Sequence, residues 1–151
     1  MEIVSLSVDE LQRIEPLWKE LIAFLHRQST RFKMEFEQKQ FASRIQTYLD
    51  KVKDGKYLID VIVDLESNRD IGYCLSSVTK DSIGEVDSLY VKEEYRDAHM
   101  GTILMQRAMD FFEMHHTIKD VLHVSEGNEH ALSFYEKYGF QTRYYQLVRE
   151  K

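Results

Sequence analysis

The chain has 151 residues, of which 43% are hydrophobic and 12% are aromatic. This composition is enough for one folded core and excludes a generally disordered chain. Charged residues make up 30%, and 26 acidic side chains against 20 basic ones give a net charge of −6. Because nucleic-acid binders usually present a basic surface, this charge argues against a nucleic-acid partner.

Cys74 is the single cysteine, so neither an intrachain disulfide nor a cysteine-rich zinc site is expected. No apolar run approaches the roughly 20 residues that a membrane span needs. The first four residues, Met-Glu-Ile-Val, include an acidic side chain and lack a signal-peptide pattern. These features predict a cytoplasmic protein without a membrane segment.

The first third of the chain predicts one short strand and two helices. Residues 2–7 alternate apolar and polar side chains, as a half-buried strand does. Apolar residues recur every three or four positions over 11–25, which is helical spacing, and Pro16 is expected to kink or divide that helix. A second helical pattern covers 35–53 and ends at Asp54-Gly55.

From residue 57 onward, the apolar period changes from 3.6 to 2, which indicates strands. Three strands with short turns predict an antiparallel meander, and the helix that follows leads to a strand expected to run parallel to the third. The expected strands are 57–64, 71–79, 85–91, 120–125 and 141–148, and the expected helices are 101–115 and 128–138. With no linker or repeat, the sequence predicts a single domain over residues 1–151, with a mixed α/β sheet and helices on its faces.

The segment from Val86 to Thr102 combines a strand, a turn and the start of a long apolar helix. Unpaired N–H groups and the helix dipole at such a start attract anions. Arg96 adds a positive charge, and Gly101 allows close approach of the backbone, so a phosphate group is the expected ligand. An ordinary strand-to-helix loop with an incidental arginine is the alternative interpretation.

A second informative segment, residues 128–140, reads Asn-Glu-His-Ala-Leu-Ser-Phe-Tyr-Glu-Lys-Tyr-Gly-Phe. Asn128 occupies an N-cap position, apolar residues follow at helical intervals, and Gly139 is a C-terminal stop signal. Taken alone, the segment is explained as an amphipathic helix with good caps.

Together the two segments resemble the GNAT superfamily of acyl-CoA-dependent N-acyltransferases. The first is similar to the family pattern Arg/Gln-x-x-Gly-x-Gly/Ala, with Arg96 and Gly101 in place and His99 at the first glycine position. The second is similar to Asn-x-x-Ala-x-x-Phe-Tyr-x-x-x-Gly-Phe, matched at Asn128, Ala131, Phe134, Tyr135, Gly139 and Phe140. The order of the elements also agrees with the family's α+β fold, a mixed, mostly antiparallel sheet flanked by helices.

The resemblance implies an N-acetyltransferase with acetyl-CoA as co-substrate and no metal. The acceptor it implies is a primary amine of a small molecule or a peptide. Tyr135 takes the role of general acid towards the departing thiolate, and Glu85 is the best-placed general base. The residues expected to contact acetyl-CoA are Leu89, Tyr90, Val91, Arg96, Asp97, Ala98, His99, Met100, Gly101, Thr102, Asn128 and Tyr135.

Several of these side chains allow a second interpretation. Asp87 shares the strand face of Glu85 by the period of 2, and both can instead be solvated carboxylates at a strand end. His123 and Ser125 on the next strand are further candidates for a proton relay. A side chain at 99 can obstruct phosphate binding and strain a turn of positive φ, and the nearby Asp97 is acidic. A catalytically impaired binding module is therefore the alternative to an enzyme.

The remaining signals are weaker. His115-His116 lacks a third ligand at useful spacing, so the end of a solvated helix is expected there rather than a metal site. The acidic net charge slightly favours a cationic small amine as acceptor. Tyr144 and Tyr145, on the expected last strand, are interpreted as lining a substrate channel or forming a homodimer contact.

Overall fold

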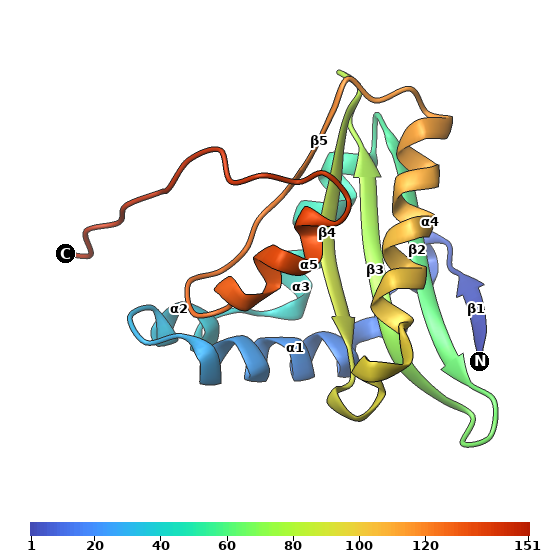
Figure 1. Ribbon diagram of the computed structural model, residues 1–151, viewed down its shortest axis with the longest axis horizontal. Helices are drawn as coiled ribbons and strands as arrows, with labels where there is room; N and C mark the ends of the chain where they lie inside the picture. The colour runs from blue at the N-terminus through green and yellow to red at the C-terminus, as the bar shows by residue number, and fades with distance from the viewer.

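The strands of the computed structural model, which describes all 151 residues, lie in one sheet of order β1-β2-β3-β4-β5 (Figure 1). The strands are β1 (Glu2–Ser5), β2 (Lys56–Asp64), β3 (Arg69–Val78), β4 (Ile83–Val91) and β5 (Lys119–Leu122). The α-helices are α1 (Glu15–Gln28), α2 (Lys33–Glu37), α3 (Phe41–Val52), α4 (Met100–Met114) and α5 (Leu132–Glu136). Three 3-10 segments complete the fold: η1 (Val8–Ile14), η2 (Glu93–Ala98) and η3 (Glu129–Ala131).

Neighbouring strands pair antiparallel except β4 and β5, which are parallel and joined through α4. The predicted meander and the predicted parallel crossover are both confirmed. The result is an α+β fold with a mixed, mostly antiparallel sheet, as the sequence predicted. No helix combines the length and the apolar character that a membrane span requires.

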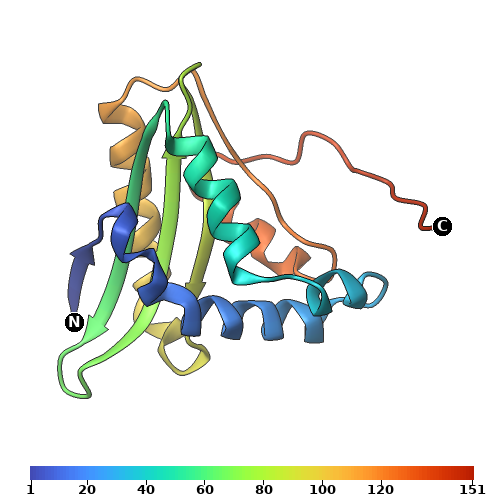
Figure 2. The same cartoon turned by 180° about the vertical axis from the view of Figure 1, so that it is seen from behind.

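Two hydrophobic clusters cover the two faces of the sheet (Figures 1 and 2). On one face, Trp18 of α1 and Tyr48 of α3 pack against alternate residues of β2 and β3. On the other face, Leu104 and Phe112 of α4 pack with Cys74 of β3, and α5 lies at the border of this cluster. β4 contributes to both clusters, so its position is fixed from both sides.

The two predicted N-terminal helices are each divided. Pro16 lies in the first turn of α1, after η1, which confirms the predicted division. The predicted helix 35–53 consists of two helices, because Gln40 is extended at φ −123° and ψ 137°. Phe36 and Phe41, on either side of this break, are both buried. Five residues apart on a single helix, they would face about 140° apart, so the break allows both to enter the core.

The predicted last strand, 141–148, is wrong for this chain. Residues 141–151 contain no helix or strand, and every one of them is exposed. Phe140 is the last residue that packs against a core cluster. The alternating pattern predicts a strand, but a strand needs a hydrogen-bonded neighbour, and the segment finds none in its own chain.

Candidate active site

A β-bulge divides β4 at Asp87. Val86 pairs with Ser76 and Ser88 pairs with Leu75, so Asp87 is the one extra residue opposite β3. Its carboxylate meets Lys51 of α3, and the next hydroxyl, that of Ser88, lies 2.7 Å from the Tyr73 hydroxyl in the cluster on the same face. Two successive side chains therefore point to one face, which is how a bulge re-aims a strand.

Beyond the bulge, β4 loses its partner on one side. β5 pairs only with Ile83–Val86, and its chain then turns away from β4 (Figure 1). The outer edge of β4 from Asp87 to Val91 is therefore open. An unpaired strand edge presents a row of N–H and C=O groups that can pair with an extended ligand.

The register of β3 shows which atoms face this open edge. The N–H of Lys92 donates to the carbonyl of Ile71, so the hydrogen-bonded positions of β4 before it are Tyr90 and Ser88. The N–H and C=O groups of Leu89 and Val91 therefore point outward, away from β3. Arg44 of α3 donates to the carbonyl of Asp87, 2.5 Å away, at the start of this edge.

The open edge leads to the N-terminus of α4. His99 is the residue before the helix and adopts the left-handed conformation, with φ 61° and ψ 21°. No side chain caps the helix, and its first hydrogen bond to the preceding residue runs from the N–H of Ile103 to the carbonyl of His99, so the N–H groups of Met100–Thr102 have no acceptor within the helix. The N–H groups of this first turn and the positive end of the helix dipole suit an anion such as a pyrophosphate. The positive φ considered from the sequence is thus present at His99.

Arg96 is held at the junction of strand and loop. Its Nε donates to the outward carbonyl of Val91, 3.0 Å away. Its guanidinium lies over the rings of Phe24 and Tyr90, with distances of 4.5 Å and 5.5 Å to the ring centroids. The two Nη groups make no hydrogen bond within the chain, so they remain as donors beside the loop.

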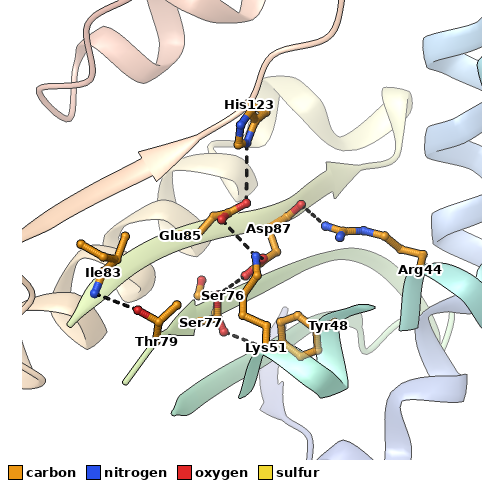
Figure 3. Close-up of polar contacts among 10 residues, drawn as sticks. All are labelled: Arg44, Tyr48, Lys51, Ser76, Ser77, Thr79, Ile83, Glu85, Asp87 and His123. Atoms are coloured by element: carbon orange, nitrogen blue, oxygen red, sulfur yellow. Dashed lines mark hydrogen bonds and ion pairs between the residues drawn. The ribbon is translucent and has the colours of Figure 1, made fainter. Parts of the chain in front are cut away.

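A polar cluster formed by Lys51, Ser77, Glu85 and Asp87 lies at the other end of the open edge (Figure 3). The Lys51 ammonium contacts Glu85 Oε1 at 3.0 Å and also Asp87 Oδ1. Ser77 donates to Asp87 Oδ2 at 2.6 Å. Glu85 and Asp87 thus share one face of β4, as the sequence predicted, and neither is a freely solvated strand-end carboxylate.

The two carboxylates of the polar cluster differ in whether all of their oxygens have hydrogen-bond partners. The Asp87 side chain is 0% exposed, and both of its oxygens have partners. Burial raises the pKa of Asp87, while Lys51 and Ser77 act in the opposite direction. Glu85 keeps Oε2 free of hydrogen bonds, with His123 Nδ1 3.7 Å away and largely exposed. Glu85, rather than Asp87, therefore has an oxygen available to a substrate.

Tyr135 extends from α5 into the border of the cluster on the α4 face. Burial, and secondarily the nearby Cys74 thiol, raise the pKa of Tyr135 to about 12. Its hydroxyl has no hydrogen-bond partner in the chain and stays protonated at neutral pH. Cys74 pairs with Leu89 across the strands, so Tyr135 lies near the level of the open edge.

The remaining expected residues differ in how they are engaged. Asn128 precedes η3, and its side-chain amide makes no hydrogen bond. Asp97 and Ala98 are exposed in η2, whereas Met100 is buried under the loop. Ser125 lies two residues beyond His123 and makes no side-chain hydrogen bond to the polar cluster. The structure gathers no group of three or more His, Cys, Asp or Glu side chains that could bind a metal.

Sequence reasoning missed Lys51 and Arg44, which bind the bulge from α3. With Tyr48 between them they follow helical spacing, and the Tyr48 hydroxyl donates to the Ser76 carbonyl at 2.7 Å. The spacing shows that the three residues share a helix face. It does not show which strand that face meets, so the link to β4 required the fold.

The comparison with family models decides the family. Residues 18–140 match the model of the acetyltransferase (GNAT) family. The chain belongs to the GNAT acetyltransferase family. It is thus an acetyltransferase-family enzyme, and the family uses acyl-CoA. No curated protein sequence matches the chain.

Several solved structures share the fold at low sequence identity. A mutant of the BH1408 protein from Bacillus halodurans is 17% identical, with TM-score 0.74, over 100% of this chain and 99% of that one. Glucosamine-6-phosphate N-acetyltransferase from Arabidopsis thaliana is 19% identical, with TM-score 0.63, over 99% and 97%. An aminoglycoside N-acetyltransferase in complex with CoA is 11% identical, with TM-score 0.65, over 99% and 98%. At these identities, the matches establish the fold and leave the acceptor open.

Proposed function

We propose that this GNAT enzyme transfers an acetyl group from acetyl-CoA to a primary amine by direct attack. The observation that carries the proposal is the open edge of β4, Asp87–Val91, which leads to the N-terminus of α4, where the N–H groups of Met100–Thr102 have no acceptor within the helix. A strand edge that continues to a helix N-terminus suits an extended ligand with an anionic end. Acetyl-CoA combines an amide-containing arm, a pyrophosphate and an acyl thioester.

Different residues along this edge and the loop would bind different parts of acetyl-CoA. The outward N–H groups of Leu89 and Val91 would bind the amide and acyl carbonyls, with Tyr90 fixing the strand between them. Residues 96–102 would bind the pyrophosphate through backbone N–H groups, with Arg96 as an additional donor. Asn128, whose amide is free, would contact the pantetheine arm from the opposite side.

Acyl transfer needs a hydrogen-bond donor at the acyl oxygen, a base for the amine proton and an acid for the thiolate. Backbone N–H groups of β4 would supply the first. Tyr135, which remains protonated at neutral pH, would donate a proton to the departing thiolate. Glu85 would take the amine proton through its free Oε2, directly or with exposed His123 as a relay.

The charges around Glu85 refine the choice of acceptor. Lys51 and Arg44 bring two positive charges to the same end of β4 as Glu85 and Asp87. The local balance is therefore neutral, which weakens the expectation of a strongly cationic amine. We infer a small or peptide-borne primary amine whose own polar groups can pair with both signs of charge.

The test begins with calorimetric titration of acetyl-CoA and an assay of CoA thiol release over a panel of amines. The panel contains amino sugars, aminoglycosides, polyamines and lysine peptides. We expect micromolar binding, about −8 kcal/mol, and release of thiol with at least one amine class. No binding at millimolar acetyl-CoA would contradict the proposal and leave the impaired binding module as the function.

Two substitutions test the catalytic assignments once an acceptor is found. Tyr135→Phe is expected to lower kcat by about 100-fold with acetyl-CoA affinity preserved, because only the donor is lost. Tyr138→Phe is the matched control, since Tyr138 packs on the same Phe134 ring and is half-buried. Equal rates in the two variants would remove Tyr135 from the acid role.

Glu85→Gln is expected to lower kcat by a similar factor and to remove the acidic limb of the pH–rate profile. The profile separates loss of a base from loss of structure, because a merely displaced Lys51 would lower the rate at every pH. An unchanged acidic limb in Glu85→Gln would assign the base elsewhere, with His123 the next residue to test.

A further inference from the structure

A carboxylate from the segment after β5 binds the turn between α1 and α2. Glu126 Oε1 accepts hydrogen bonds from the N–H of Arg31 at 2.8 Å and from both the N–H and the hydroxyl of Thr30 at 3.0 Å. Burial acts to raise the pKa of Glu126, but the N–H donors of Arg31 and Thr30 outweigh it and hold the pKa below its ordinary value. The carboxylate is therefore charged at neutral pH, which strengthens these hydrogen bonds.

The turn depends on this carboxylate for its backbone hydrogen bonds. The N–H of Ser29 completes the last turn of α1, and the N–H of Phe32 donates to the Ser29 hydroxyl at 3.0 Å. Between these two residues, the N–H groups of Thr30 and Arg31 donate to Glu126. Two of four successive N–H groups thus have their protein acceptor on a segment far along the chain, and loss of Glu126 would leave them to water.

The backbone after Glu126 lies directly against the end of α1. Gly127 has a φ of +90°, and a Cβ at this position would lie 2.2 Å from the Gln28 carbonyl oxygen. Glycine allows both this conformation and this close approach. We call this contact, of residues 126–127 with residues 28–31, the brace.

The same end of α1 also contacts the β4 side of the open edge. Phe24 lies under the Arg96 guanidinium, with 4.5 Å to the ring centroid. Arg27 pairs with Glu93 of η2 at 3.0 Å. His130 of η3 meets the Phe24 ring edge to face, with 6.2 Å between the centroids. The end of α1 therefore spans the space between the loop that follows β4 and the segment that follows β5.

The sheet itself does not hold these two sides together. β5 pairs with β4 only as far as Leu122, opposite Val86, and residues 123–128 form neither helix nor strand. Figures 1 and 2 show this segment leaving β4 and meeting the α1–α2 turn at its far end. The brace therefore fixes the far end of the segment, immediately before Asn128.

We propose that Glu126 is a positioning residue, which through the brace holds Asn128 at a fixed distance from the open edge of β4. This inference rests on the proposed function, in which the pantetheine arm of acetyl-CoA lies between that edge and Asn128. A ligand that contacts both sides binds more tightly when they are already in place, because binding does not have to order them. The pyrophosphate contacts the β4 side alone, through residues 96–102, so its binding does not depend on the brace.

Glu126→Ala removes the carboxylate of the brace, and calorimetric titration compares two ligands. One is acetyl-CoA, and the other is ADP, which has a pyrophosphate but no pantetheine arm. We expect Glu126→Ala to weaken acetyl-CoA binding about tenfold and ADP binding less than about twofold, because only acetyl-CoA contacts both sides. A general loss of structure would instead weaken both ligands alike.

Two further variants sharpen this comparison. Glu126→Gln keeps an oxygen that can accept from Thr30 and Arg31, so it should retain acetyl-CoA affinity within about threefold of the unaltered chain. Glu136→Ala is the matched control, since Glu136 is an exposed glutamate of α5 that lies outside the brace. It should bind both ligands as the unaltered chain does.

Amide hydrogen exchange, measured by NMR, tests the brace without a ligand. The amides of Thr30 and Arg31 should exchange about tenfold faster in Glu126→Ala than in the unaltered chain, and at the same rate in Glu136→Ala. Unchanged exchange in Glu126→Ala, or equal weakening of acetyl-CoA and ADP, would overturn the role of Glu126. An unaltered chain that binds no acetyl-CoA would overturn the proposed function as well, whereas normal binding there with no loss in Glu126→Ala would overturn this inference alone.

Discussion

The two ends of the open β4 edge satisfy their polar groups in opposite ways. At the bulge end, Lys51, Ser77 and Asp87 bind one another, and the Asp87 side chain is fully buried. At the loop end, the N–H groups of Met100–Thr102 have no acceptor within α4, and His99 is left-handed. One end is a closed network, and the other presents the first-turn N–H groups of a helix.

This difference separates residues that fix geometry from residues that await a ligand. A closed buried network is expensive to break, because removal of one member leaves another charge without a partner. The first-turn N–H groups of a helix at a solvent-exposed loop contribute little to folding but can bind strongly to an anion. Substitutions at the bulge end should therefore change stability most, and substitutions at the loop end should change affinity most.

The largest effect is expected for Lys51→Met. The substitution keeps the length of the side chain but leaves the buried Asp87 carboxylate without its cation. We expect a loss of about 3 kcal/mol in the free energy of unfolding, measured by urea denaturation at pH 7. Lys53→Met is the matched control, because Lys53 is exposed and forms no ion pair, and it should change stability by less than about 0.5 kcal/mol. Equal losses would show that the cluster is not a coupled network.

The cost of Lys51→Met should also depend on pH. Burial already raises the pKa of Asp87 above the ordinary value of 3.8, and loss of the Lys51 charge should raise it further. A carboxyl with a raised folded-state pKa contributes stability below its unfolded pKa, and this stability is lost as the pH rises through the folded pKa. The difference in the free energy of unfolding between Lys51→Met and the unaltered chain should therefore decrease as the pH falls from 7 towards 4. This decrease is about 1.4 kcal/mol for each unit by which the loss of Lys51 raises the folded-state pKa of Asp87.

Urea titrations at several pH values measure this decrease. The double variant Lys51→Met, Asp87→Asn removes the titrating group and should show a difference from the unaltered chain that does not decrease in this way. A difference for Lys51→Met that is constant with pH would mean that Asp87 is not the group left unpaired.

The contrast between the two ends also explains what the sequence could predict. Local signals were sufficient for the strand order, the parallel crossover and the loop before α4, because each depends on periodicity or on a short motif. Glu85 and Asp87 were correctly assigned to one face by their spacing. The contacts of Lys51 with Glu85 and Asp87 were missed, because the partners are separated by 34 and 36 positions along the chain.

Two predicted elements differ from the structure because tertiary contacts prevailed over local pattern. The helix 35–53 breaks because Phe36 and Phe41 both enter the core. The strand 141–148 has the right alternation but no neighbour in its own chain. Local pattern states what a segment can form, whereas a strand or a continuous helix also requires a surface to pack on.

The smallest effect on stability, and the most informative effect on binding, is expected at His99. A left-handed residue with a Cβ costs about 1–2 kcal/mol, and glycine recovers part of this at the cost of a more flexible unfolded chain. We therefore expect His99→Gly to raise the free energy of unfolding by about 0.5 kcal/mol.

Ser82→Gly is the control that separates relief of backbone strain from an effect on acetyl-CoA binding. Ser82 also has a positive φ, of 62°, but lies in the turn before β4, remote from the α4 N-terminus. Both glycine variants should therefore gain similar stability. Only His99→Gly should tighten acetyl-CoA binding, by several-fold in calorimetric titration, because only there does the side chain lie beside the first-turn N–H groups of α4. If both variants bind acetyl-CoA as the unaltered chain does, the His99 side chain is no obstacle, and the loop tolerates it because binding uses backbone donors alone.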